Sequence, residues 1–200
     1  MAKLFDLISS AHLVQAIIFG GVFAYLTANV IMNAVFKRMT TTVNGWRIAR
    51  DCGKPGNGIL KRAASARILP AINSVEEAAY WTTTVDGTGR RLNGRSGYLL
   101  HFPTGQLPPN EAFWSLTLTD VAGFMVSNPI ERYSLGDRSG LVPNADGSVD
   151  IFIQRTPPSG HEPNWLPAPA GPFKLMLRAY LPGTEILNGG YQLPPVTRVD

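Results

Sequence analysis

The sequence predicts a mainly β protein: an antiparallel jelly-roll-like β-sandwich preceded by one N-terminal transmembrane helix and a short basic amphipathic helix. Three runs alternate apolar and polar side chains, over residues 113–119, 149–154 and 173–180. A period of two is typical of half-buried strands, because successive side chains leave the pleat on opposite faces. The three runs therefore predict a sheet with one apolar and one polar face, and turns rich in glycine and proline separate them.

Composition divides the chain into four parts. We expect an N-terminal flank over residues 1–12, a transmembrane helix over 13–36, a basic juxtamembrane connector over 37–73 and a β-sandwich over 74–200. A chain of 200 residues, 44% of them hydrophobic, is long enough for one core and an appendage. A single cysteine excludes an intrachain disulfide.

The apolar run over residues 13–36 contains no charged side chain. Because a helix needs about 20 apolar residues to cross the hydrocarbon of a bilayer, the run predicts a single-pass membrane protein. The alternative is a signal peptide cleaved after Ala24, but the apolar run continues well beyond that position.

Small residues recur at every fourth position of this run, so they share one face of the expected helix. They are Ala16, Gly20, Ala24 and Ala28. Such a ridge lets a second helix approach closely, which predicts a membrane-protein partner or a homo-oligomer. The alternative is that the spacing arises by chance, because glycine and alanine are common in membrane helices.

The net charge of +4 is unevenly distributed. Residues 37–75 carry eight Lys or Arg and one acidic residue, whereas residues 76–200 carry nine basic and twelve acidic residues. A basic segment beside a mildly acidic domain favours the lipid bilayer, and not nucleic acid, as the partner. The positive-inside rule then favours a cytoplasmic β domain.

Two short helices are expected between the membrane run and the strands. Residues 59–69 mix apolar and basic side chains, which predicts an amphipathic helix that docks on the sandwich or lies on anionic lipid. Ser74 and Glu77 have the spacing of a capping box, which predicts a brief helix before the strand-forming run 80–85. Further on, residues 98–102 predict a strand, and the proline-rich stretch 157–172 predicts a long loop.

Several segments, in this order, resemble the bacterial family known as domain of unknown function 1214. They are Phe113-Trp114-Ser115-Leu116-Thr117, Asn128-Pro129-Ile130-Glu131-Arg132-Tyr133-Ser134, Asn164-Trp165-Leu166-Pro167-Ala168-Pro169 and Arg178-Ala179-Tyr180. The resemblance covers residues 60–199 and implies a jelly-roll-like sandwich with no established activity. Members of this family are frequently exported, which opposes the charge asymmetry. Thr119 and Tyr191 depart from the aromatic residues usual in the family, which weakens any shared aromatic platform.

Catalytic chemistry has little support in the sequence. The chain has no Gly-x-Ser-x-Gly elbow, and three histidines with one cysteine predict neither a metal cluster nor a cofactor site. The candidates for a hydrolase or carbohydrate-active enzyme are Asp120, Asp137 and His161, and a histidine without a geometric partner is more often structural.

Arginines and aromatic residues on the strands suit the binding of a carboxylate, a sugar or another protein. The candidate ligand-binding residues are Trp114, Arg132, Tyr133, Asn164, Trp165, Arg178 and Tyr180. The alternative is structural: Arg132 and Arg178 pair with Asp120 or Asp137, and Trp165 covers the edge of the core. We therefore expect a membrane-anchored binding module or accessory subunit of a membrane assembly, with a membrane-tethered hydrolase as the alternative.

Overall fold

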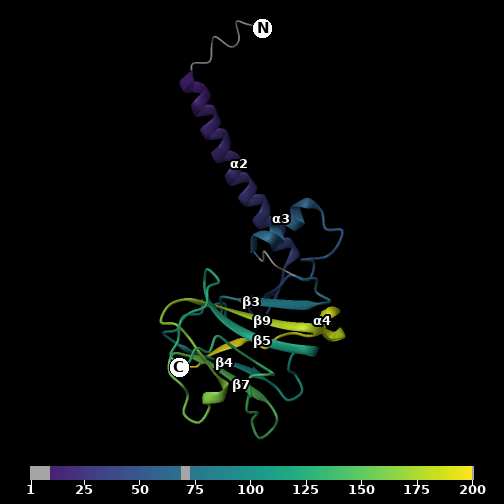
Figure 1. Cartoon of the computed structure of the whole chain (residues 1–200), viewed down its shortest axis with the longest axis vertical. Helices are drawn as coiled ribbons and strands as arrows, with labels where there is room; N and C mark the ends of the chain where they lie inside the picture. Colours follow the sequence, from purple (N-terminus) through teal and green to yellow (C-terminus); the bar gives the residue numbers. More distant parts are fainter. Residues whose placement is uncertain (1–9, 69–72, 200) are drawn as a thin grey trace.

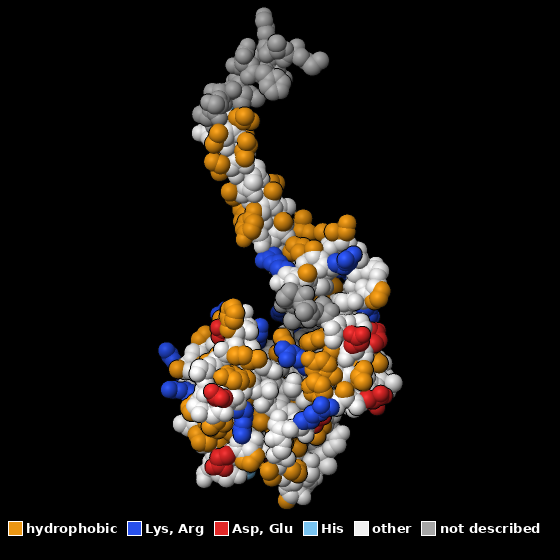
Figure 2. Space-filling model, in the orientation of Figure 1, with side chains coloured by type: hydrophobic (Ala, Val, Ile, Leu, Met, Phe, Trp, Pro, Cys, Tyr) orange, Lys and Arg blue, Asp and Glu red, His pale blue; other side chains and the backbone are white. Residues whose placement is uncertain are grey.

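One long helix leads into two stacked β-sheets (Figure 1) in the computed structural model, which describes residues 10–68 and 73–199. The helix, α2 (Ser10–Met39), contains a stretch from His12 to Met39 that is long and apolar enough to cross a membrane. Apolar side chains cover it, and Lys37 and Arg38 lie in its last turn, next to the β domain (Figure 2). The expected apolar helix is confirmed, and it extends beyond residues 13–36 at both ends.

The β domain consists of a six-stranded and a four-stranded sheet. In spatial order, the first contains β1 (Thr41–Val43), β2 (Trp46–Ile48), β3 (Ala78–Thr83), β9 (Phe173–Pro182), β5 (Asn110–Asp120) and β6 (Ser134–Gly136). The second contains β10 (Val196–Val199), β4 (Gly97–Phe102), β7 (Val149–Gln154) and β8 (Trp165–Pro167). Among the described strand pairs, only β7 and β8 run parallel. The mainly β class is thus confirmed.

The three alternating runs are β5, β7 and β9, but they do not form one sheet. β5 and β9 are neighbours, with Leu116 opposite Leu177, whereas β7 lies in the other sheet. The expectation of a single sheet is wrong because the apolar faces of two sheets meet to form the core. Leu116, Leu177 and Ile151 are fully buried there, and burying each such side chain contributes about 1.5–3 kcal/mol.

The apolar helix α2 is closely connected to the six-stranded sheet. Thr40 alone separates α2 from β1. The helix α3 (Ile59–Ile68) packs against α2, and a buried cluster of Phe36, Met39, Cys52 and Ala64 joins the two. We predicted that residues 59–69 dock on the sandwich or lie on lipid. In the structure this helix packs against the end of α2, where the small side chain of Ala64 allows a close approach.

Two local predictions also change. After Ser74 the chain makes a single turn, in which the N–H groups of Glu77 and Ala78 donate to the Ser74 carbonyl. The predicted brief helix is wrong because β3 begins at Ala78 and pairs with β9. The proline-rich stretch is a loop only in part, since it contains β8 and the short 3-10 helix η1 (Glu162–Asn164). The last helix, α4 (Thr184–Leu187), follows β9.

Candidate functional site

Arg132 contacts the segment around η1. The sequence analysis placed Arg132 and Trp165 among the same candidate ligand-binding residues, and the structure brings them together. Its Nη1 donates hydrogen bonds to the carbonyl oxygens of Glu162 (2.6 Å) and Trp165 (2.8 Å). A guanidinium that donates to carbonyls holds a loop against its neighbour. Among residues 10–68 and 73–199, no ion pair joins Arg132 or Arg178 to Asp120 or Asp137. Arg132 makes these backbone contacts instead, and the Arg178 Nε donates to the Met176 sulfur at 3.2 Å.

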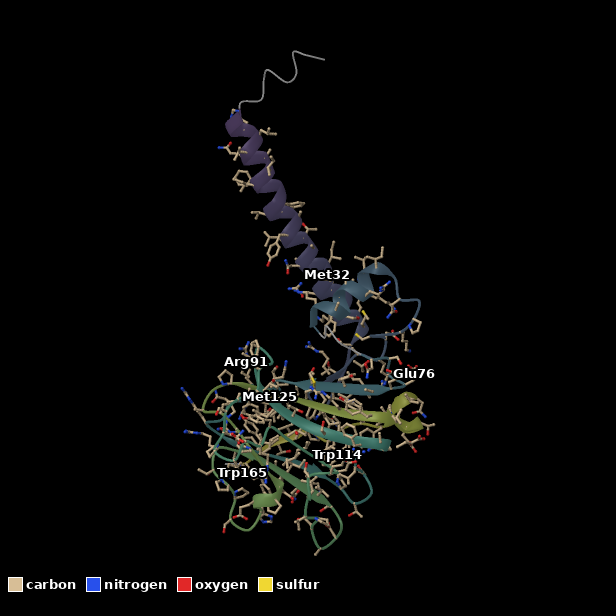
Figure 3. The ribbon with its side chains drawn as sticks, in the orientation of Figure 1. Met32, Glu76, Arg91, Trp114, Met125 and Trp165 are labelled. Atoms are coloured by element: carbon tan, nitrogen blue, oxygen red, sulfur yellow. The ribbon has the colours of Figure 1, made fainter. Side chains whose placement is uncertain are left out.

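The neighbours of Arg132 are equally engaged. Asn164 is buried and binds backbone groups of Val142 and Asp150 at 2.8 Å each. Trp165 is buried against the four-stranded sheet, away from α2, and its Nε1 donates to the Gln154 carbonyl at 2.8 Å (Figure 3). Tyr133 is half-buried, and its carbonyl accepts from Leu118.

The remaining candidates for catalysis lie in separate surroundings. Asp120 accepts the N–H groups of its own turn, including that of Gly123 at 2.7 Å. Asp137 accepts the N–H of Trp114 at 3.3 Å, and the Trp114 side chain packs in the core, where it is 2% exposed. His161 stacks on Phe152 with 4.9 Å between ring centroids. Each of these three residues therefore has a structural contact of its own, and the contacts do not bring the three together.

Sequence reasoning missed one polar pair. His101 on β4 lies opposite Asp150 on β7, and 2.6 Å separates the His101 Nδ1 from the Asp150 Oδ1. Asn144 donates to the second oxygen of Asp150 at 2.9 Å. Only the strand register brings His101 and Asp150 together, and their separation in the sequence gives no sign of it. Within the described chain, no hydroxyl is hydrogen-bonded to His101.

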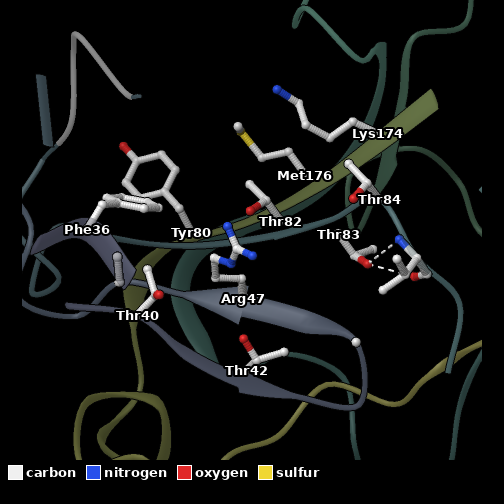
Figure 4. A pocket seen from close by; sticks show the side chains of 13 residues that line it. Phe36, Thr40, Thr42, Arg47, Tyr80, Thr82, Thr83, Thr84, Lys174 and Met176 are labelled. Atoms are coloured by element: carbon white, nitrogen blue, oxygen red, sulfur yellow. Dashed lines mark hydrogen bonds between the residues drawn. The ribbon is translucent and has the colours of Figure 1, made fainter. Parts of the chain in front are cut away.

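A groove of about 300 Å³ lies between the end of α2 and the outer face of the six-stranded sheet. Figure 4 shows Phe36 and Tyr80 at one end and Lys174 at the other, with Arg47 and Thr82 between them. The six-stranded sheet lies between α2 and the four-stranded sheet, so this outer face is the one turned toward the helix (Figure 1).

Strand alternation positions these side chains. Tyr80 and Thr82 alternate with the buried Ala79, Trp81 and Thr83 along β3, and therefore point to the opposite face. The register then sets Arg47 of β2 opposite Thr82, and Thr82 opposite Met176 of β9. One row across three strands thus carries a cation, a hydroxyl and a thioether.

The charges in the groove are unbalanced. Arg47 and Lys174 are its charged residues, and the described side chains that line it include no Asp or Glu. Neither cation has an ion-pair or hydrogen-bond partner in the described part of the chain. Burial raises the pKa of Tyr80 above its ordinary value, so its phenol is a neutral hydrogen-bonding group in the groove.

Two predicted ligand residues border this groove. Arg178 lies opposite Tyr80 in the strand register, and Tyr180, two positions further along β9, stacks on Phe113 at a centroid distance of 4.4 Å. The predicted set therefore divides between two regions. Arg47 was missed because it lies in a strand of only three residues, which is too short for its alternation to predict a strand.

Comparisons with known proteins agree with the fold. The family model described as "Protein of unknown function (DUF1214)" matches residues 77–184. The crystal structure of the VPA0106 protein from Vibrio parahaemolyticus is 28% identical, with a TM-score of 0.61, and the alignment covers 72% of this chain and 36% of that one. An uncharacterized protein from Burkholderia cenocepacia is 14% identical, with a TM-score of 0.43, over 93% of this chain and 52% of that one. No curated protein matches.

Proposed function

Because the chain belongs to a family of proteins of unknown function, DUF1214, its role must be inferred from the groove, and we propose that it is a single-pass, membrane-anchored binding module. The observation that carries this proposal is the pair of unpartnered cations, Arg47 and Lys174, in a groove whose wall includes the end of the apolar helix. Two cations without a carboxylate favour an anionic ligand.

The ligand that we propose is the phosphate-bearing headgroup of an anionic lipid. α2 is uncharged up to Phe36 and carries Lys37 and Arg38 directly afterwards, so the interface of the bilayer falls at this turn. Phe36 and Thr40 line the groove, which puts it at the depth of the headgroups. Arg47 and Lys174 then bind phosphate oxygens, and Thr82 donates to them through its hydroxyl.

The helix α3 supports the same geometry. It packs against the end of α2, and Ile59 and Leu60 at its start are 84% and 56% exposed. Lys61 and Arg62 follow them. Exposed apolar side chains beside basic ones are typical of a helix that lies in the interface of an anionic membrane. We therefore propose that α3 is the basic amphipathic helix and that it rests on lipid.

The finer topology also belongs to this proposal. From β3 onward the chain alternates between the sheets by single strands or consecutive pairs, with β3, β5, β6 and β9 in one sheet and β4, β7, β8 and β10 in the other. Alternation of this kind is a property of double-sheet jelly rolls. We propose a jelly-roll-like sandwich in which β1 and β2 are an added hairpin that links the membrane helix to β3.

Native mass spectrometry of the full chain, extracted from membranes that contain phosphatidylglycerol, tests the lipid site. We expect anionic lipid to remain bound, and Arg47→Gln with Lys174→Gln to lower its retention roughly 25-fold, since each basic residue near a membrane contributes about 1 kcal/mol. The charge-matched control is Arg95→Gln with Arg155→Gln, because both of these arginines are exposed and lie outside the groove. Equal retention by all three proteins would refute the site.

The side of the membrane is a separate question. The basic flank after α2 favours the cytoplasm, whereas resemblance to the family favours export. Cys52 is 1% exposed and is a poor target for labelling. We propose placing an accessible thiol with Ser159→Cys in a Cys52→Ala background. Labelling of intact cells by an impermeant maleimide indicates an exported domain, and labelling only after lysis indicates a cytoplasmic one.

A further inference from the structure

A second cavity, of about 160 Å³, lies on the core side of the six-stranded sheet. Trp46, Ile48 and Trp81 line it, and these buried residues alternate along β2 and β3 with the outward-facing residues of the groove. The C-terminal segment 189–193 closes the cavity from the other side. The groove and this cavity share no lining residue, so a ligand in the cavity is independent of the proposed lipid site.

Arg50 brings an unsatisfied charge to this cavity. Its Nε is buried and has no hydrogen-bond partner among the described residues. The guanidinium lies against Gly189, where a Cβ atom would come within 3.1 Å of Nη1. Arg50 as a whole is half-buried, but a buried N–H without a partner is unfavourable, and the described residues that line the cavity include no Asp or Glu to accept from it. Arg50 thus has donors available on the wall of an enclosed space.

Trp46, Trp81 and Tyr191 form the aromatic part of the lining, and the polar atoms of Trp46 and Tyr191 are already bound. The Trp46 Nε1 donates to the Pro194 carbonyl at 2.8 Å, and the Tyr191 hydroxyl donates to the Gln106 carbonyl at 3.0 Å. The Trp81 and Tyr191 rings meet edge to face, with 6.2 Å between centroids. Burial raises the pKa of Tyr191 far above its ordinary value, so its hydroxyl keeps its proton. These residues therefore present ring surfaces to the cavity.

We propose that this cavity binds a small organic anion: one carboxylate on a flat apolar body. The carboxylate accepts hydrogen bonds from Arg50, and the body packs against Trp46, Trp81 and Tyr191. A space of ~150 Å³ accommodates one benzene ring, which is the size class expected here. A bare inorganic anion satisfies Arg50 but leaves the apolar walls without contacts, so it is the poorer ligand.

Benzoate is the probe, and benzyl alcohol is the uncharged control of the same shape. Trp46 and Trp81 line the cavity, so intrinsic tryptophan fluorescence of the full chain in detergent reports occupancy. We expect saturable binding of benzoate that is roughly tenfold or more tighter than that of benzyl alcohol, the difference expected for a buried charge-assisted hydrogen bond. Acetate, which lacks the ring, is expected to bind more weakly than benzoate.

Variants separate a binding site from a structural cavity. Arg50→Met keeps an unbranched side chain and removes the charge, so it abolishes the preference for benzoate over benzyl alcohol, whereas Arg50→Lys retains part of it. Arg47→Gln, in the groove, leaves benzoate binding unchanged. If Arg50→Met fails to fold, Arg50→Lys still tests the preference. No benzoate signal, or equal affinity for the two probes in the wild-type chain, overturns the proposal and indicates a cavity filled by water alone.

Discussion

Arg132 and Arg47 lie in two regions of the β domain where the guanidinium groups have different surroundings. Arg132 donates to main-chain carbonyls around η1, where Asn164 and Trp165 are also hydrogen-bonded. Arg47 shares its groove with Lys174, and neither has a partner in the described chain. The first region uses its donors to hold loops together, and the second keeps them available. The proposed ligand site is therefore distinguished from a structural contact by hydrogen-bond donors that have no partner in the described chain, and not by the presence of arginine.

The largest effect is expected in the region of Arg132, from Asn164→Ala. The change removes three hydrogen bonds to backbone groups of Val142 and Asp150. We expect the free energy of unfolding to fall by about 3 kcal/mol, measured by urea denaturation of the full chain in detergent. The matched control, Asn188→Ala, is exposed and is expected to cost less than about 1 kcal/mol. Unchanged stability of Asn164→Ala would restore this residue as a ligand candidate.

A crossed pair of variants tests the comparison directly. Arg132→Gln loses contacts with two carbonyls and is expected to lower the free energy of unfolding by about 2 kcal/mol while lipid retention stays unchanged. Arg47→Gln is expected to change stability by less than about 0.5 kcal/mol and to lower lipid retention roughly fivefold. The comparison fails if Arg132→Gln releases lipid or if Arg47→Gln unfolds the domain.

Much of the fold was predictable from the sequence because its signals are local. The apolar run of α2 and the alternation of β5, β7 and β9 depend only on neighbouring residues. The resemblance to DUF1214, carried by ordered short motifs, is confirmed by the family match over residues 77–184. Sheet membership was not predictable, since the placement of β7 beside β4 depends on pairing between distant segments.

The candidate site was harder to predict from the sequence for the same reason. Motif composition drew attention to Arg132 and Trp165, whose donors are occupied by backbone carbonyls that no side-chain pattern reveals. Arg47 and Lys174 are far apart in the sequence, and β2, β3 and β9 must pair before the two line one groove. Tyr191, flagged as a departure from the family, became informative only once its ring was seen to form a wall of the Arg50 cavity.

Asp86, like Arg132, forms its hydrogen bonds with neighbouring groups of the protein, which are those of Thr88 and Arg90. Burial alone would raise its pKa, but hydrogen bonds from Thr88 and Arg90 outweigh that effect and hold the pKa below its ordinary value. The stability that Asp86 contributes is therefore present above about pH 4 and is lost as the pH falls through the lower folded-state value. Asp86→Asn is expected to cost about 2 kcal/mol at pH 7 and less at pH 2, which urea unfolding at both pH values measures. A constant loss across that range would contradict this assignment.

Substitutions in α2 are expected to have the smallest effect on the free energy of unfolding of the β domain. Ala16, Gly20, Ala24 and Ala28 are exposed along α2, and a Cβ at Gly20 would meet no atom. We propose that this ridge carries the association with a second copy or a membrane partner. Gly20→Leu with Ala24→Leu is then expected to weaken the association while leaving urea unfolding of the β domain within about 0.5 kcal/mol of wild type.

Crosslinking in native membranes measures that association, and Val22→Leu with Leu26→Val, elsewhere along α2, is the matched control. Crosslinks that persist in Gly20→Leu with Ala24→Leu would exclude the ridge as the interface. If lipid retention in the groove also persists while crosslinks disappear, association and lipid binding are independent, and the unpartnered cations act within a single chain.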